Sequence, residues 1–428
     1  MRFQLYGSMI RIALRALGMM LNAATFALAA RTLSTVHMGI WALATALTTI
    51  TLSLDLGLSC TLRNRLADKP EEGQMLFQQV FSLCLLVASV YCLAILVGGG
   101  IALGLCWPCS EFWNPLRQTM VASLLTGVSL ILLRLPFNLA ANACYSYNEP
   151  NFPIYWELFN FSTSFLLVAT AAYFHGGPVL STAAYLLGGT LTGLCSTAHW
   201  LRRRGWSMQL KWPQHARAWI RGGASFGFLQ LAALGLTALP SFLVGSLVQL
   251  EDVTIARASM ILCQATLLLH LAHAMPLWTE FTQLRGSVDC QPRLVALRRR
   301  LHLESGLLLL AFTCMALMLP WAIGVWLDRN VDIRVTTAFC AWGAGCGLYN
   351  LHSLVLNGGG RPLLTAAAVI PGGALATLLA WLLSPTMGTP GIALAFALGA
   401  VVSATVMMLL AHFAMRSTET ERSSLVTR

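Results

Sequence analysis

The stretch Arg31–Ala67, RTLSTVHMGIWALATALTTITLSLDLGLSCTLRNRLA, decides the fold class of this chain. Its apolar run, Gly39–Leu58, is followed by the basic residues Arg63, Arg65 and Lys69. About 20 apolar residues at a helical rise of 1.5 Å cross a hydrocarbon core of roughly 30 Å, so the run predicts a membrane-spanning helix. The basic cluster indicates that this end of the helix faces the cytoplasm.

The composition extends this interpretation to the whole chain. Of its 428 residues, 57% are hydrophobic and 10% are charged, and the mean hydropathy is +0.69. Soluble domains carry about 25% charged residues, so almost all of this chain is expected to lie in lipid. The apolar runs predict an all-α membrane protein with about twelve transmembrane helices. The expected spans are 8–30, 37–58, 75–96, 119–141, 152–174, 179–200, 222–247, 254–275, 303–326, 335–356, 362–383 and 390–415.

The net charge of +11 reflects membrane topology rather than nucleic-acid binding. With a cytoplasmic N-terminus, 19 of the 27 Lys and Arg residues fall on the cytoplasmic side of these spans. This excess is the positive-inside pattern, which predicts an even number of spans and two cytoplasmic termini. Cleavage of a signal peptide near Ala30 would leave an odd number, so we expect the first span to be retained.

The chain is expected to divide around a basic cytoplasmic segment, with six spans on either side. The predicted parts are an N-terminal lobe at 1–201, a linker at 202–221, a C-terminal lobe at 222–415 and a cytoplasmic tail at 416–428. Membrane transporters commonly consist of two such halves, which move about a site near the midplane. This organisation therefore favours a transporter.

Three arginines, Arg11, Arg15 and Arg134, lie inside predicted spans. An arginine at the centre of a lone membrane helix costs about 2.5–3.5 kcal/mol on insertion scales, so each needs a partner or water. Arg11 and Arg15 are four residues apart and share a helix face. Both could instead extend their side chains to the cytoplasmic headgroups, which is the structural alternative to a binding role.

Polar residues accompany these arginines and complete a predicted binding cavity. Asn138 follows Arg134 by four residues, and Glu157 and Asn160 are three apart in the fifth span. A guanidinium engages two phosphate oxygens at once through its planar fork of donors. We therefore predict that Arg11, Arg15, Arg134, Asn138 and Glu157 line a water-filled cavity that binds the phosphate groups of a substrate.

Two further acids are candidates for a gate or for ion coupling. Asp55 lies at the end of the second span, and Glu280 follows the eighth. The structural alternative for Asp55 is a helix-end acid that pairs with Arg63 or caps the turn at Gly57.

Four segments, in the right order along the chain, resemble Wzx-type polysaccharide flippases. The first is the second span, which starts with Gly-Ile-Trp, ends with Asp-Leu-Gly-Leu and continues into an Arg-rich segment. The second is Met-Pro-Leu-Trp at 275–278, which precedes an acid and an Arg-rich helix. The third and fourth are Asn-Gly-Gly-Gly-Arg-Pro at 357–362 and Pro-Gly-Ile-Ala at 390–393. These flippases belong to the MOP group of transporters, which also contains the MATE drug exporters. The chain departs from their pattern at Glu280, which follows Trp278 and Thr279 directly, and in the 142–151 loop, which lacks basic residues.

The resemblance implies a MATE-like arrangement of two six-helix lobes around a V-shaped cavity. It also implies a flippase that moves an undecaprenyl-diphosphate-linked oligosaccharide across the bacterial inner membrane, for O-antigen or another surface polysaccharide. The expected partners are this lipid-linked oligosaccharide, membrane lipids and polysaccharide assembly proteins, and we expect neither nucleic acid nor a cofactor or metal.

Other functions stay open. A MATE-type exporter of cations would favour interior acids, whereas interior arginines outnumber them here. A polysaccharide polymerase or lipid-sugar transferase usually needs acids on a sizeable outer loop. A structural scaffold is the third alternative, and loss of surface polysaccharide in Arg134→Ala with expression intact would exclude it. The phosphate-binding signature G-x-x-x-x-G-K is absent, so no use of ATP is implied. Cys106 and Cys109 form a C-x-x-C pair that we expect to be incidental to function, with or without a disulfide.

Overall fold

The computed structural model describes the backbone of residues 2–47, 54–106, 114–147, 149, 151–213, 216–274, 277–278, 280–281, 291–328, 330–359 and 361–426. It also describes the side chains in these ranges, except those of residues 2–9, 67–68, 99–106, 272–273, 291 and 416–426. The chain divides into two compact units, here called the first unit (Ala13–Gln230) and the second unit (Leu231–Arg428 together with Met1–Ile12). The division falls inside a helix, whereas the sequence predicts a linker at 202–221; the predicted lobe boundaries stay a prediction.

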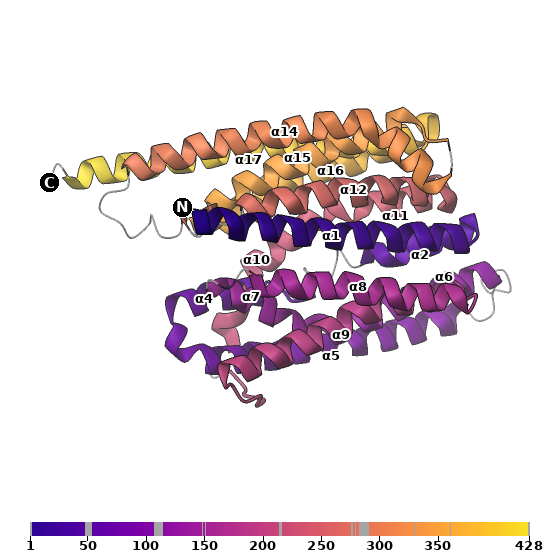
Figure 1. Cartoon of the computed structure of the whole chain (residues 1–428), viewed down its shortest axis with the longest axis horizontal. Helices are drawn as coiled ribbons and strands as arrows, with labels where there is room; N and C mark the ends of the chain where they lie inside the picture. Colours follow the sequence, from indigo (N-terminus) through magenta and orange to yellow (C-terminus); the bar gives the residue numbers. More distant parts are fainter. Residues whose placement is uncertain are drawn as a thin grey trace. The chain divides into compact units, whose positions relative to one another are not determined.

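The first unit is built from helices that pack mainly around α9. Its elements are α1 (Arg2–Thr32), α2 (Thr35–Ala46), α4 (Leu58–Asp68), η2 (Pro70–Glu72), α5 (Gly73–Cys106), α6 (Pro115–Arg134), η4 (Leu135–Asn138), α7 (Leu139–Ser146), α8 (Asn151–Tyr173), α9 (Pro178–Arg204) and α10 (Ala216–Thr237), of which α1 and α10 also extend into the second unit. Helices α8 and α6 run along α9 (Figure 1), and α2 and η4 also contact it.

The second unit centres on its last helix. Its remaining elements are α11 (Leu239–Leu247), α12 (Leu250–Ala274), α14 (Gln291–Leu327), α15 (Ile333–Gly358), α16 (Pro362–Met387) and α17 (Thr389–Val426). Helices α15 and α16 lie along α17 (Figure 1). Small residues allow this close approach, because the backbone of Gly372 meets that of Gly399 and Gly345 faces Ala400. Such small-residue contacts are typical of helix packing in lipid.

The apolar helices make this a multi-pass membrane protein. In the described part of the chain, eight helical segments are long and apolar enough to cross a membrane, and the bent pair α10–α11 makes a ninth. Of the three remaining predicted spans, α8 and α15 occupy 152–174 and 335–356, and α2 covers the first part of 37–58. Large apolar side chains such as Leu317, which is 81% exposed, face outward from these helices. The predicted fold class, all-α with about twelve spans in two lobes, is confirmed.

The fourth predicted span is not one continuous helix. Helix α6 ends at Arg134, the 3-10 segment η4 follows, and α7 continues the path to Ser146, inside the segment predicted as a loop. Pro136 explains the break because it has no N–H to donate to the carbonyl one turn earlier. The N–H of Leu135 instead donates to the carbonyl of Leu132. A 3-10 segment inside a helical path often marks a functional hinge, and this one begins directly after Arg134 and ends at Asn138.

A tight turn starts α4. Gly57 has a φ of 74°, a left-handed conformation that favours glycine. The carboxylate of Asp55 accepts hydrogen bonds from the backbone N–H of Gly57 at 2.9 Å and of Ser59 at 3.0 Å. Gly57 also lies against the backbone of Gly223 and Gly227 in α10, so a side chain there would collide with that helix.

Candidate functional site

A polar cavity of about 290 Å³ lies inside the first unit. Four helical paths form it: α1, the broken path α6–η4–α7, α8 and α9. We call it the cationic pocket. Its polar lining residues are Arg15, Arg134, Asn138, Tyr145, Glu157, Asn160, Thr192 and Ser196, and its aromatic ones are Phe137, Phe152, Trp156 and Phe161.

Arg15 reaches this cavity from α1 and is held by two other helices. Its Nε lies 3.4 Å from Oε2 of Glu157 on α8, and its Nη2 donates to the hydroxyl of Tyr145 on α7 at 3.4 Å. The side chain of Arg15 is 11% exposed, and that of Glu157 is 30% exposed. The Tyr145 ring also lies 5.1 Å from the guanidinium carbon of Arg63 on α4. Glu157 thus faces one of several cationic groups around this end of the pocket.

Arg134 is placed by the break in the fourth span and by glycines of α9. Its Nε donates to Oδ1 of Asn138 at 3.0 Å, one turn further along the chain. A side-chain carbon at Gly189 would collide with the guanidinium of Arg134, and one at Gly193 would press against Phe137. The glycine face of α9 therefore leaves the space in which Arg134 lies.

Two buried polar atoms in the pocket are available to a ligand. Neither Oδ1 of Asn160 on α8 nor Oγ1 of Thr192 on α9 has a hydrogen-bond partner within the described ranges. Thr192 is 5% exposed. Buried polar atoms are almost always paired, so both atoms can take part in hydrogen bonds to a molecule that enters the pocket.

The structure brings four of the five predicted binding residues together. Arg15, Arg134, Asn138 and Glu157 all line the cationic pocket. Arg11 lies one turn before Arg15 on α1 and is not among the lining residues that the structure describes; its binding role stays a prediction.

The two candidate gate residues have structural partners. Asp55 is 7% exposed and caps the start of α4, which matches the structural alternative for it. Glu280, in the second unit, accepts a hydrogen bond from Nη1 of Arg300 at 3.1 Å. Arg300 also lies 4.0 Å from Glu304, whose carboxylate is 3.7 Å from Nδ1 of His270. A gating or coupling role for Asp55 and Glu280 stays a prediction.

Sequence reasoning missed Tyr145, Thr192 and Ser196. Tyr145 falls in the segment predicted as a loop, so no helix face was assigned to it. Thr192 and Ser196 are four residues apart on α9, and each follows by three residues one of the two glycines that face Arg134 and Phe137. Their spacing relative to Gly189 was the available signal.

Where side chains are described, no group of three or more His, Cys, Asp or Glu residues is placed to hold a metal ion. Cys109 and the side chain of Cys106 lie outside the described residues, so the expectation about this pair stays a prediction.

Comparisons with known proteins identify the fold. Protein-family models and curated protein sequences give no match. Among solved structures, a multidrug resistance MATE family transporter of the MOP superfamily, in its inward-facing conformation, has a TM-score of 0.71 at 12% identity over 96% of this chain and 99% of that one. A MOP superfamily transporter from Pyrococcus furiosus has a TM-score of 0.72 at 13% identity over 96% of both chains. A MATE protein in its straight conformation has a TM-score of 0.72 at 12% identity, over 96% of this chain and 95% of that one. This chain therefore has the fold of MATE transporters of the MOP superfamily.

Proposed function

We propose that this protein is a Wzx-type flippase. In this proposal it moves an undecaprenyl-diphosphate-linked oligosaccharide from the cytoplasmic to the outer leaflet of a bacterial inner membrane, for O-antigen or another surface polysaccharide. Both termini are cytoplasmic, and enzymes and carriers of polysaccharide assembly are its expected partners.

The observation that carries the proposal is the meeting of Arg15 and Arg134 in one cavity. Both belong to helices that are apolar enough to cross a membrane. Buried arginines in such helices mark substrate or ion pathways, because keeping them there costs free energy. With one carboxylate, that of Glu157, the lining residues of the pocket carry a net positive charge. That charge suits an anion.

The remaining lining groups suit a phosphorylated sugar. The planar fork of a guanidinium holds two phosphate oxygens at once, so Arg15 and Arg134 together can hold a diphosphate. The unpartnered Oδ1 of Asn160 can accept a hydrogen bond from a sugar hydroxyl, and the hydroxyl of Thr192 can donate to a phosphate or sugar oxygen. Sugars and diphosphate cannot cross hydrocarbon unaided, whereas a prenyl chain can stay in lipid. Exposing such a site to each side in turn would move the head group between leaflets.

A MATE-type exporter is the second candidate. The fold favours it, because one structural neighbour is described as a multidrug resistance transporter. Glu157 also offers a partly exposed carboxylate to an organic cation. Against it, Arg15 already faces that carboxylate at 3.4 Å. The neighbour from Pyrococcus furiosus is described as having a binding pocket of reverse polarity that suggests a different function, so pocket polarity varies within this fold.

Reconstituted full-length protein separates the two candidates. Liposomes would carry a fluorescent undecaprenyl-diphosphate disaccharide, and its movement between leaflets would be followed with a membrane-impermeant quencher. We expect transport that falls at least tenfold in Arg134→Ala and is unchanged in Arg334→Ala, whose side chain is exposed and paired with Asp332. Export of an organic cation, with no lipid movement, would instead establish the exporter.

A further inference from the structure

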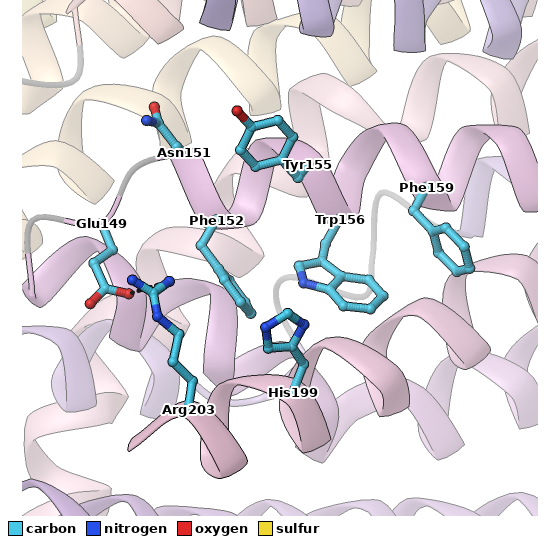
Figure 2. A pocket seen from close by; sticks show the side chains of 8 residues that line it. All are labelled: Glu149, Asn151, Phe152, Tyr155, Trp156, Phe159, His199 and Arg203. Carbon is cyan, nitrogen blue, oxygen red and sulfur yellow. Dashed lines mark ion pairs between the residues drawn. The ribbon is translucent and has the colours of Figure 1, made fainter. Parts of the chain in front are cut away.

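A second cavity, of about 670 Å³, lies between α8 and α9 in the first unit. Figure 2 shows Phe152, Trp156 and Phe159 following one another along α8, with His199 of α9 facing them. The ring centroids of Phe152 and Trp156 are 6.2 Å apart, and those of Trp156 and Phe159 are 5.4 Å apart. We call this cavity the aromatic groove.

The groove has a charged end and an apolar body. At one end, Arg203 of α9 lies 3.6 Å from the carboxylate of Glu149, as the dashed line in Figure 2 marks. The body is aromatic and open, because Tyr155 is 53% exposed and Phe159 is 47% exposed. These exposed rings give the groove an accessible apolar lining, which suits a hydrocarbon chain.

The groove and the cationic pocket share a wall. Phe152 and Trp156 line both cavities. The helical repeat of α8 explains this, since Glu157 points to the pocket, Phe159 to the groove, and Trp156 lies between them. One layer of two aromatic side chains therefore separates a polar cavity from a groove with an aromatic lining.

We propose that the aromatic groove holds the first isoprenoid units of the lipid carrier while its diphosphate lies in the cationic pocket, with the junction between head and chain beside Phe152 and Trp156. This inference rests on the proposed function. A prenyl diphosphate matches both chambers, because it joins a doubly charged head directly to an apolar chain. A sugar fits the groove less well. The carboxylate of Glu149, which could bind sugar hydroxyls, is already paired with Arg203 and Arg204. The rings of Trp156, Phe159 and His199 also pack edge to face against one another, so they do not form a flat surface on which a sugar ring could stack.

The test compares two probes on full-length protein in lipid nanodiscs. Inorganic pyrophosphate reports on the cationic pocket alone, and farnesyl diphosphate reports on the pocket and the groove together. We expect farnesyl diphosphate to bind at least tenfold more tightly than pyrophosphate. Phe159→Ala, which changes the groove but no pocket residue, should remove most of that ratio and leave pyrophosphate affinity unchanged. Tyr173→Ala is the matched control, because this aromatic residue of α8 is 80% exposed and lies outside both cavities.

Photolabelling identifies what occupies the groove. A farnesyl diphosphate that carries a diazirine at the chain end should label α8 within 151–159, and Arg134→Ala should reduce the labelling. Equal labelling by the matching farnesol probe would mean that ordinary lipid chains fill the groove, which overturns the inference. An unchanged affinity ratio in Phe159→Ala would overturn it as well. Failure of the proposed function gives a different result, namely pyrophosphate binding that does not depend on Arg134.

Discussion

Arg134 lies in the cationic pocket because Gly189 on α9 has no side chain to occupy the same space. The guanidinium is fixed by Asn138 on one side and bounded by bare helix backbone on the other. Its position therefore depends on two helices that are distant in sequence. Sequence reasoning identified the arginine from its cost in lipid, but not the glycine that makes room for it.

Gly189→Ala tests this dependence. The added carbon would collide with the guanidinium and displace it from the pocket. Alanine also favours helix over glycine by about 1 kcal/mol, so the protein should stay folded. We expect lipid transport to fall at least tenfold at matched protein level. We expect the thermal stability of the purified protein to be unchanged. Gly235→Ala in α10 is the control, since a side chain there meets open space. Full transport in Gly189→Ala would show that the position of Arg134 is not critical.

A substitution series at Arg134 and Arg15 tests the diphosphate role. Alanine at either position should abolish export of surface polysaccharide while the protein stays in the membrane, because the helix becomes more apolar. Lysine should rescue partly, since it keeps the charge without the planar fork, and glutamine should not rescue. The measurement is the amount of surface polysaccharide at matched protein expression, and it should decrease in the order arginine, lysine, then glutamine and alanine. Full activity in both alanine variants would place the binding site on other residues.

At the scale of the element, the sequence predicted where helices lie better than where they break. Runs of apolar residues fix the spans because lipid demands about 20 of them. The break at η4 depends on Pro136, which a membrane helix can also accommodate without a break. Tyr145 was consequently assigned to a loop, although α7 carries it back to the pocket.

Asp55 stabilises the start of helix α4, and substitutions can distinguish this structural role from a role in gating. Its carboxylate accepts two backbone hydrogen bonds at the start of α4. Loss of such a cap costs about 0.5–2 kcal/mol, so Asp55→Ala should lower the thermal unfolding midpoint of the purified protein. Asparagine keeps one acceptor and removes the charge, so Asp55→Asn should retain most of the stability and the transport. A stable Asp55→Asn protein without transport would favour the gating hypothesis.

At the scale of the molecule, charge and apolar length were enough to predict an all-α membrane protein with about twelve spans, whereas the MATE-like arrangement of its lobes was implied by the family resemblance. Charge and apolar length are sums over the whole chain, so an error in any one predicted helix boundary hardly changes them. The division into units was less accessible, because it falls within α10 after Gln230, where no change of composition marks it. Arrangement of the pocket residues was accessible only in part, since it depends on contacts among four helical paths.

The predicted topology can be checked with single cysteines in a cysteine-free background. Positions beside Arg203 and Arg299 should react with a membrane-impermeant maleimide only after the membrane is permeabilised, because both lie in basic segments. A position beside Asp332 should react in intact cells. Labelling at Arg203 or Arg299 from outside intact cells would reverse the orientation.

The contact between Glu157 and Arg15 gives the pocket an internal competitor for any anion that enters. A carrier must bind its cargo firmly enough to load and weakly enough to unload, and a carboxylate 3.4 Å from one arginine limits the residence time of a diphosphate. Removing that competitor in Glu157→Gln should therefore tighten pyrophosphate binding and slow its dissociation, while steady-state transport falls. If the site only had to bind its ligand, tighter binding would not reduce activity. A carrier, in contrast, transports more slowly when its cargo dissociates more slowly.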